Sequence, residues 1–170
     1  MMRHILSVAA LLAAGTLAAC GPTSPEKPAF YVDMSSPGAR FDAVSARDMI
    51  NAYRIKEGLP AVNLDPALTA AAEQESIIVS RRAASTGKVT PDNDLEAKVR
   101  AAGYPVGGMR RNVSAGYYTI AEAFSGWRES DQHRRTLLME DATDMGIAAI
   151  HQPRAKYKVY WTLIMARREK

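Results

Sequence analysis

The sequence predicts an α+β domain in which helices pack on a small antiparallel sheet. Segments with helix-capping residues come first, strongly β-favouring segments come last, and a short turn joins the final two of these. Helices followed by a late hairpin are typical of α+β domains, whereas a Rossmann-like parallel sheet would alternate strand and helix. The sequence also lacks the glycine-rich phosphate loop of nucleotide-binding folds.

Three helices are expected in the first half of the domain. Residues 45–58 begin with a Ser-x-x-Asp capping box and end at a glycine, which favours a helix C-cap. Residues 65–84 begin with Asp65-Pro66, an N-cap followed by proline at the first helical position. A third helix covers residues 94–102 and is closed by the glycine that follows it.

The second half carries the expected sheet. Residues 111–116 form a short strand, and a Thr-x-x-Glu capping box opens a helix over residues 119–127. A serine caps a short helix over residues 131–138. Residues 145–151 and 157–166 are rich in β-favouring side chains, and the short turn between them predicts an antiparallel hairpin.

The N-terminus has the pattern of a secretion signal. A short cationic start precedes an almost wholly apolar run, residues 5–19, without an acid or a base. As a helix this run reaches about 22 Å, too short for a hydrocarbon core of about 30 Å, so a cleaved signal over residues 1–19 fits better than a membrane span. Leu17-Ala18-Ala19-Cys20 resembles a lipobox, in which the thiol accepts a diacylglycerol.

Cys20 is the chain's only cysteine and has no disulfide partner, so lipidation is its expected role. Two or more acyl chains hold a protein stably on a bilayer. Gly21 rather than Asp follows the cysteine, which favours the periplasmic side of the outer membrane over the inner membrane. Residues 20–40, rich in proline and serine, are expected to be a mobile tether, and residues 41–170 the domain.

The charge balance does not indicate a nucleic-acid partner. The full chain carries a net charge of +4, which falls to +3 once Arg3 leaves with the signal. The two signs are interspersed, and the basic stripe with interleaved aromatic residues of a nucleic-acid interface is missing. The densest cationic cluster, residues 166–170, is expected to be a frayed polar tail.

Several segments occur together in the order and spacing of a known family. They are Ile50-Asn51-Ala52-Tyr53-Arg54 with Gly58-Leu59-Pro60, Leu64-Asp65-Pro66-Ala67-Leu68, Arg100-Ala101-Ala102-Gly103-Tyr104, Asn112-Val113 with Ala115-Gly116, Gly126-Trp127 with His133-Arg134, Asp144-Met145-Gly146-Ile147, and Tyr160-Trp161-Thr162. This ordered set, spanning about residues 43–165, resembles the bacterial branch of the CAP superfamily of cysteine-rich secretory, antigen 5 and pathogenesis-related proteins. The resemblance implies an α-β-α sandwich.

Many members of that family carry two histidines and two acids around a cleft, and some bind zinc or another divalent cation there. On this resemblance, Ser85 stands where the family has its first histidine, and Arg111 replaces the glutamate of a Glu-Asn-Ile motif. Ser130 occupies the position of the second acid, and only His133 is kept. A guanidinium repels a cation, so no metal and no other cofactor is expected.

Two nearby carboxylates have less certain positions in this cleft. Glu129 is one residue out of register, and Glu75 on the second helix is either a cleft residue or, as we favour, a surface acid with a basic neighbour. His133 is either a cleft residue or a structural hydrogen-bonding partner. Ser85 or Ser130 beside His133 would make a nucleophilic pair only with an orienting group and an oxyanion hole, which the sequence does not secure.

These residues favour a binding or scaffolding module of the cell envelope over an enzyme. A cleft with Arg111, His133 and two hydroxyls suits an anionic small molecule or envelope component, because a guanidinium pairs well with carboxylate or phosphate. The main alternative is a metal-dependent hydrolase of the protease or nuclease type. A further alternative is lipid or sterol carriage, with the aromatic strand over residues 157–161 lining a groove.

Overall fold

A computed structural model describes residues 27–170, so the expected signal peptide and the lipidation site Cys20 lie outside the described residues. The elements follow the predicted order of early helices and late strands. They are the short 3-10 helix η1 (Ala29–Tyr31), α1 (Ala43–Lys56), β1 (Asn63–Leu64), α2 (Pro66–Thr86), α3 (Leu95–Ala101), β2 (Val106–Ala115), α4 (Ile120–Glu129), α5 (Asp131–Leu137), β3 (Asp144–His151) and β4 (Val159–Arg168).

The sheet has the order β1-β3-β4-β2. The predicted hairpin is confirmed, because β3 and β4 pair antiparallel from Asp144 opposite Ala166 to His151 opposite Val159. β2 pairs antiparallel with the other side of β4. The expectation of a wholly antiparallel sheet is wrong at one edge, where β1 runs parallel to β3. A strand of two residues is too short to show an alternating pattern in the sequence.

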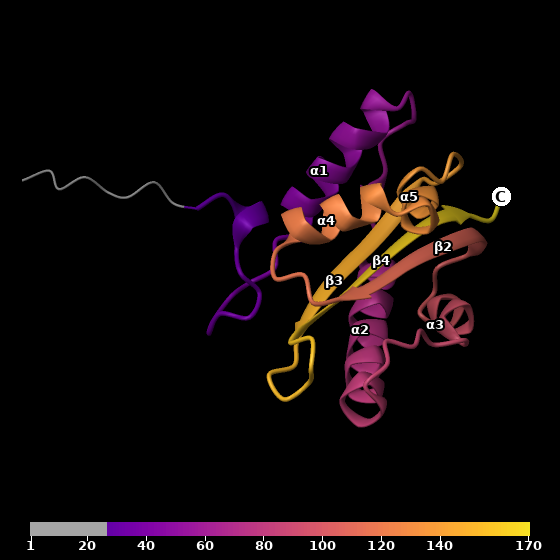
Figure 1. Cartoon of the computed structure of the whole chain (residues 1–170). Helices are drawn as coiled ribbons and strands as arrows, with labels where there is room; N and C mark the ends of the chain where they lie inside the picture. The colour runs from indigo at the N-terminus through magenta and orange to yellow at the C-terminus, as the bar shows by residue number, and fades with distance from the viewer. Residues whose placement is uncertain (1–26) are drawn as a thin grey trace, which may run out of the picture.

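Helices cover both faces of the β3–β4 pair, which makes the domain the α-β-α sandwich that the resemblance implied (Figure 1). On β4, Trp161, Leu163 and Met165 pack with α1, α4 and α5 in the larger core cluster. The alternate residues Ile164 and Ala166 pack with α2 and α3. Because successive strand residues point to opposite faces, a strand covered on both sides becomes a continuous apolar run.

The helix starts test the capping predictions. The Asp65-Pro66 start of α2 and the Thr119–Glu122 capping box of α4 are both confirmed. The capping box expected at Ser45 is wrong, because α1 begins three residues earlier and Asp42 caps it by accepting the N–H groups of Val44 and Ser45. None of the helices within residues 27–170 is long and apolar enough to cross a bilayer.

The N-terminal boundary of the domain lies earlier than expected. The sequence predicted a mobile tether over residues 20–40, but the part from Pro28 onward packs on the domain. Met34 is buried, and its N–H donates to the carbonyl of Tyr118 at 2.8 Å. Phe30 and Val32 pack against the larger core cluster. Burial of these apolar side chains outweighs the flexible composition around them.

The C-terminal cluster is also ordered, in contrast to the expected frayed tail. β4 continues to Arg168, whose guanidinium lies 2.6 Å from Asp65 and 3.2 Å from Asp144. Tyr104 donates to the same Asp144 carboxylate at 2.8 Å. This ion-paired group joins the end of β4 to the N-cap of α2.

Gly146 on β3 allows α2 to approach the sheet closely, and this generates a prediction. A Cβ at this position would overlap the backbone of Leu68 and Thr69. We expect Gly146→Ala to lower the free energy of unfolding by about 1–3 kcal/mol or more, because the core must shift to accept it. Urea unfolding measures the loss. Gly108→Ala is the matched control, since its Cβ meets only side chains at 3.4 Å and beyond. Equal stability of the two variants would contradict the close approach.

Candidate functional site

Glu75 is an acid whose side chain lies on the buried face of α2. Its side chain is fully buried, on the face that α2 shares with Ala71, Ala72 and Val79. The Oε1 atom accepts the N–H of Asp92 at 2.9 Å, and no hydrogen-bond partner reaches the buried Oε2 within residues 27–170. Burial raises the pKa of Glu75, while the Asp92 N–H and the charge of Arg111 limit the rise. The expectation that Glu75 is a surface acid is therefore wrong.

Arg111 supplies the compensating charge from the edge strand β2. Its guanidinium lies 3.3 Å from Glu75 Oε1 and also donates to the carbonyl of Asp92. Three quarters of its side chain is buried, since the exposed fraction is 25%. The positive charge that we expected to face an open cleft is thus paired inside the protein.

Asp92 ties the loop between α2 and α3 to this pair. Its N–H and C=O are held by Glu75 and Arg111, and its carboxylate accepts bonds from Lys98 of α3 and Arg82 of α2. The hydrogen bond from Lys98 is the largest cause of a lowered pKa for Asp92. Two acids and three cations therefore form one network that fixes the loop, while Glu75 Oε2 is its one carboxylate oxygen without a hydrogen-bond partner within residues 27–170.

A small cavity lies beside this network, between α2 and α3. Its volume is about 310 Å³, and Glu75 and Lys98 are its charged lining residues. The remaining walls are Leu95, Gln74 and four alanines. Sequence reasoning missed Asp92, Lys98 and Arg82. The helical spacing of Glu75 with Ala71, Ala72 and Val79 was the one signal that pointed to its burial.

Ser130 and His133 lie on the other face of the sheet. Asn112 follows Arg111 directly and therefore points the opposite way, where its side chain donates to the carbonyl of His133 at 2.9 Å. His133 is half-buried, and burial lowers its pKa, which favours the neutral form of the ring. Ser130 precedes α5 but makes no side-chain capping bond there.

The two remaining candidates face solvent. The Ser85 hydroxyl donates to the carbonyl of Arg82 in its own helix at 2.9 Å, and Glu129 is exposed on the last turn of α4. The six candidates thus form no single cleft. Glu75 and Arg111 meet under α2, Ser130 and His133 lie across the sheet, and the other two lie on the surface. The prediction of one shared cleft is wrong because strand alternation sends adjacent family positions to opposite faces.

The residues present do not fit the cation that the resemblance implies. A guanidinium takes the place of a carboxylate, and a metal ion beside Arg111 would be repelled by it. Within residues 27–170, no three or more His, Cys, Asp or Glu side chains are grouped so that they could hold a metal ion. The internal ion pair lies at the position where, on the resemblance, other family members carry a carboxylate of their cation site.

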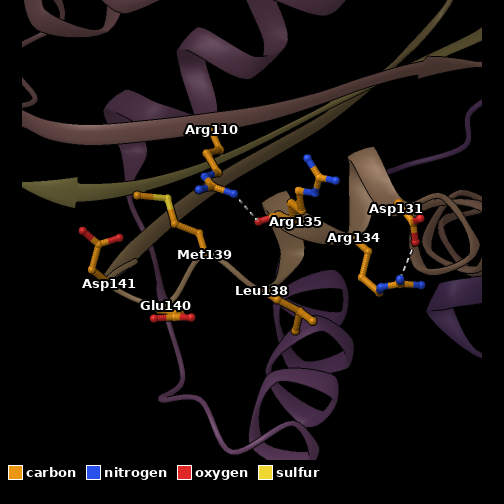
Figure 2. Close-up of a pocket in the computed structure, with 8 residues that line it drawn as sticks. All are labelled: Arg110, Asp131, Arg134, Arg135, Leu138, Met139, Glu140 and Asp141. Carbon is orange, nitrogen blue, oxygen red and sulfur yellow. Dashed lines mark hydrogen bonds and ion pairs between the residues drawn. The ribbon is translucent and has the colours of Figure 1, made fainter.

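A groove on the α5 side, which the sequence did not predict, is lined by charged side chains (Figure 2). Its volume is about 820 Å³. Arg110 of β2 donates to the carbonyl of Arg135, and Arg134 pairs with Asp131. The lining consists of Arg110, Asp131, Arg134, Arg135, Leu138, Met139, Glu140 and Asp141. Adjacent arginines at the end of a short helix were the available signal.

The fold and these residues define a domain of one family. Residues 47–165 match the model of the CAP family, described as the cysteine-rich secretory protein family, and the chain belongs to it. No curated protein sequence matches the chain significantly.

Solved bacterial structures share the fold at low sequence identity. A cysteine-rich secretory protein of Staphylococcus aureus is 19% identical, with a TM-score of 0.58 over 74% of this chain and 38% of that one. An extracellular SCP-domain protein of Bacillus anthracis is 20% identical, with a TM-score of 0.58 over 73% and 39%. An outer surface protein of Borrelia burgdorferi is 13% identical, with a TM-score of 0.59 over 76% and 97%. The chain spans less than half of the first two proteins.

The buried carboxyl of Glu75 generates a prediction about pH. Its pKa in the folded protein is raised above the ordinary 4.5, so the folded state holds more protons than the unfolded state between these two values. Stability of the native protein therefore falls as pH rises through this window. Glu75→Gln removes this loss, so the variant should gain stability relative to the native protein from pH 4.5 upward until the folded-state pKa is passed.

Urea unfolding at a series of pH values measures this difference. Glu129→Gln is the matched control, because it makes the same chemical change at an exposed site. A difference between the Glu75 variant and the native protein that stays constant with pH would contradict the burial effect.

Proposed function

We propose that the protein is a lipid-anchored CAP module of the bacterial cell envelope that binds an anionic partner and performs no metal-dependent hydrolysis. The observation that carries this proposal is the ion pair between Arg111 and Glu75, with 3.3 Å between Nη1 and Oε1. A fixed cation of the protein stands at the family position that offers a carboxylate to an external cation.

The chemistry of the pair supports binding over catalysis. A catalytic zinc needs three protein ligands and an open position for water. Glu75 has one oxygen committed to the Asp92 N–H, and the positive charge of Arg111 lies beside it. Breaking such a pair leaves a buried charge uncompensated, at a cost of about 3–5 kcal/mol for fully buried pairs. The exposed fraction of Arg111, 25%, reduces that figure here.

The proposed location of the protein in the cell rests on its sequence and on similar solved structures. The Leu17-Ala18-Ala19-Cys20 segment supports a lipid anchor, and Gly21 supports the periplasmic side of the outer membrane. Two of the similar solved structures are described as an extracellular protein and an outer surface protein. These observations support a place in the cell envelope.

The groove of Figure 2 supports an anionic ligand in place of the original Arg111 cleft. The charge of Arg134 is paired with Asp131, and that of Asp141 with Arg167. Arg110 and Arg135 are exposed and line the groove, opposed there by Glu140. Two guanidiniums with N–H groups facing solvent suit a phosphate or carboxylate group.

The lipid-carrier alternative was suggested by the aromatic strand over residues 157–161, but two of its aromatic side chains do not line a groove. Tyr160 and Trp161 are fully buried in the two core clusters on either side of the sheet. The indole of Trp161 donates to the carbonyl of Tyr117 at 2.8 Å. These aromatic side chains are used for packing.

Metal titration tests the absence of hydrolytic metal chemistry. We expect the purified protein to take up less than one equivalent of zinc or magnesium, because Arg111 repels a cation beside Glu75. Calorimetry and elemental analysis of the dialysed protein measure this. One equivalent retained at micromolar affinity, and lost in His133→Ala, would reverse the proposal in favour of the hydrolase.

A second titration tests the anionic ligand. We expect glycerol phosphate or inorganic phosphate to bind the native protein, and Arg135→Glu to weaken binding tenfold or more, since hydrogen bonds to charged groups contribute about 1.5–3 kcal/mol. Arg81→Glu is the control, because it makes the same charge change at an exposed site on α2. Equal weakening by both variants indicates general charge attraction and removes the groove from the proposal.

A further inference from the structure

Exposed aromatic and cationic side chains gather at the end of the domain where the described chain begins. Tyr31 is 48% exposed and Tyr118 is 41% exposed, although most large apolar side chains of residues 27–170 are buried. Cations are exposed on the same end. We call this set the anchor-side surface, and it consists of Lys27, Tyr31, Tyr118, Arg154 and Lys156.

The N-terminal part of this surface is fixed to the start of α4. Met34 donates its N–H to the carbonyl of Tyr118 at 2.8 Å, which holds the first described residues beside that tyrosine. Lys27 and Tyr31 line a shallow groove of about 440 Å³ together with Thr119 and Ser125. The tyrosine at 31 is therefore held in place by the domain.

The cations at 154 and 156 belong to the β3–β4 turn, which lies at the same end of the sheet (Figure 1). Gly116, two residues before Tyr118, donates its N–H to the carbonyl of Val159 just after the turn, at 3.0 Å. Lys27 and His151, at the end of β3, both lie close enough to Asp33 to help lower its pKa, although hydrogen bonds from Ser35 are the larger causes.

Two acids of this end accept hydrogen bonds from within the domain and keep their negative charge. Asp33 accepts hydrogen bonds from the hydroxyl and the N–H of Ser35, at 2.7 Å and 2.8 Å. Glu122 accepts the N–H groups of Tyr118 and Thr119 in the α4 cap. The three exposed cations Lys27, Arg154 and Lys156 outnumber these two carboxylates, so this end carries a net positive charge.

The length of the tether holds this end near the membrane. Residues 21–26 are all that separates Cys20 from Lys27. Because a fully extended chain spans at most about 3.6 Å per residue, this connection reaches no further than about 25 Å. The end of the domain that begins at Lys27 therefore stays within this distance of the lipid anchor.

We propose that the anchor-side surface docks on the anionic headgroup surface of the membrane that holds the lipid of Cys20, which rests on the lipidation proposed above. Tyrosine rings are favoured at the headgroup level, because one end is apolar and the other forms hydrogen bonds. Lysine and arginine are attracted to anionic lipids with a strength that corresponds to about a fivefold change in binding for each cation. The anchor thus fixes the domain's orientation as well as its location.

Footprinting of the mature lipidated protein tests this orientation. The protein is placed in phosphatidylcholine vesicles, in vesicles with an equal share of phosphatidylglycerol, and in neutral detergent micelles, and is then labelled by hydroxyl radicals. We expect protection of Tyr31 and Tyr118 in the phosphatidylglycerol vesicles, and unchanged labelling of Ile55, which is 62% exposed at the end of α1. Arg154→Gln with Lys156→Gln should lower the docking equilibrium about 25-fold.

Lys56→Gln with Lys170→Gln is the matched control, because it removes two exposed cations elsewhere and should keep the protection. Equal labelling of both tyrosines in vesicles and micelles overturns the docking proposal. Protection that is the same without phosphatidylglycerol, or in both double variants, overturns it as well. The mass of the N-terminal peptide distinguishes failure of the lipid anchor from failure of the docking. A Cys20 without diacylglycerol overturns the proposed anchor. An acylated Cys20 with fully labelled tyrosines overturns only the docking.

Discussion

The burial of the β3–β4 pair on both faces is the constraint on which the rest of this structure depends. Every residue of β4 from Val159 to Met165 is buried, so helices must cover each side of the sheet. Strand alternation then assigns each neighbouring side chain to one of two separate interiors. Arg111 and Asn112 are consecutive, yet one meets Glu75 under α2 and the other meets His133 of α5. The sheet itself therefore divides the residues that the family resemblance had placed in one cleft.

Buried charge follows a similar rule on both sides, because each buried ionic group has fixed partners for part of its polar atoms, while Glu75 Oε2 and one terminal nitrogen of Arg54 have none within residues 27–170. Glu75 is compensated by Arg111 and by the N–H of Asp92. On the other side, the fully buried Arg54 donates to the carbonyls of Leu137 and Met139 at 2.8 Å and 2.9 Å. It thereby joins the end of α1 to the segment that forms the floor of the α5 groove. Both networks fix loops that the apolar core alone would leave free.

The sequence predicted those parts of the fold whose signal is local. The Asp65 and Thr119 caps and the β3–β4 hairpin depend on nearby residues, and the structure has all three. β1 was missed because its two residues pair with a strand eighty residues away. The tether was placed too long because proline and serine around Phe30 concealed three apolar residues that reach the core.

The site was less predictable than the fold, because its partners come from distant segments. Nothing around Asp92 in the sequence shows that Glu75, Arg111, Lys98 and Arg82 converge on it. The alignment of Arg111 with a family carboxylate indicated that the charge at this position is reversed. It could not indicate which acid forms the ion pair with Arg111. The helical spacing of Glu75 placed it on the apolar face of its helix and thus indicated burial. We nevertheless interpreted it as a surface residue, because acids are usually exposed.

The two functional surfaces proposed for this protein lie at opposite ends of β4. Val159 begins the strand beside Gly116 and the anchor-side surface. Arg167 lies near its other end and pairs with Asp141, which lines the α5 groove. At about 3.3 Å per residue, the ten residues of β4 separate the two ends by about 30 Å, more than the reach of the short tether. A domain that rests on the membrane by its anchor-side surface therefore presents the groove to the aqueous compartment. The rigid sheet, covered by helices on both faces, is what converts attachment at one end into exposure of a binding groove at the other.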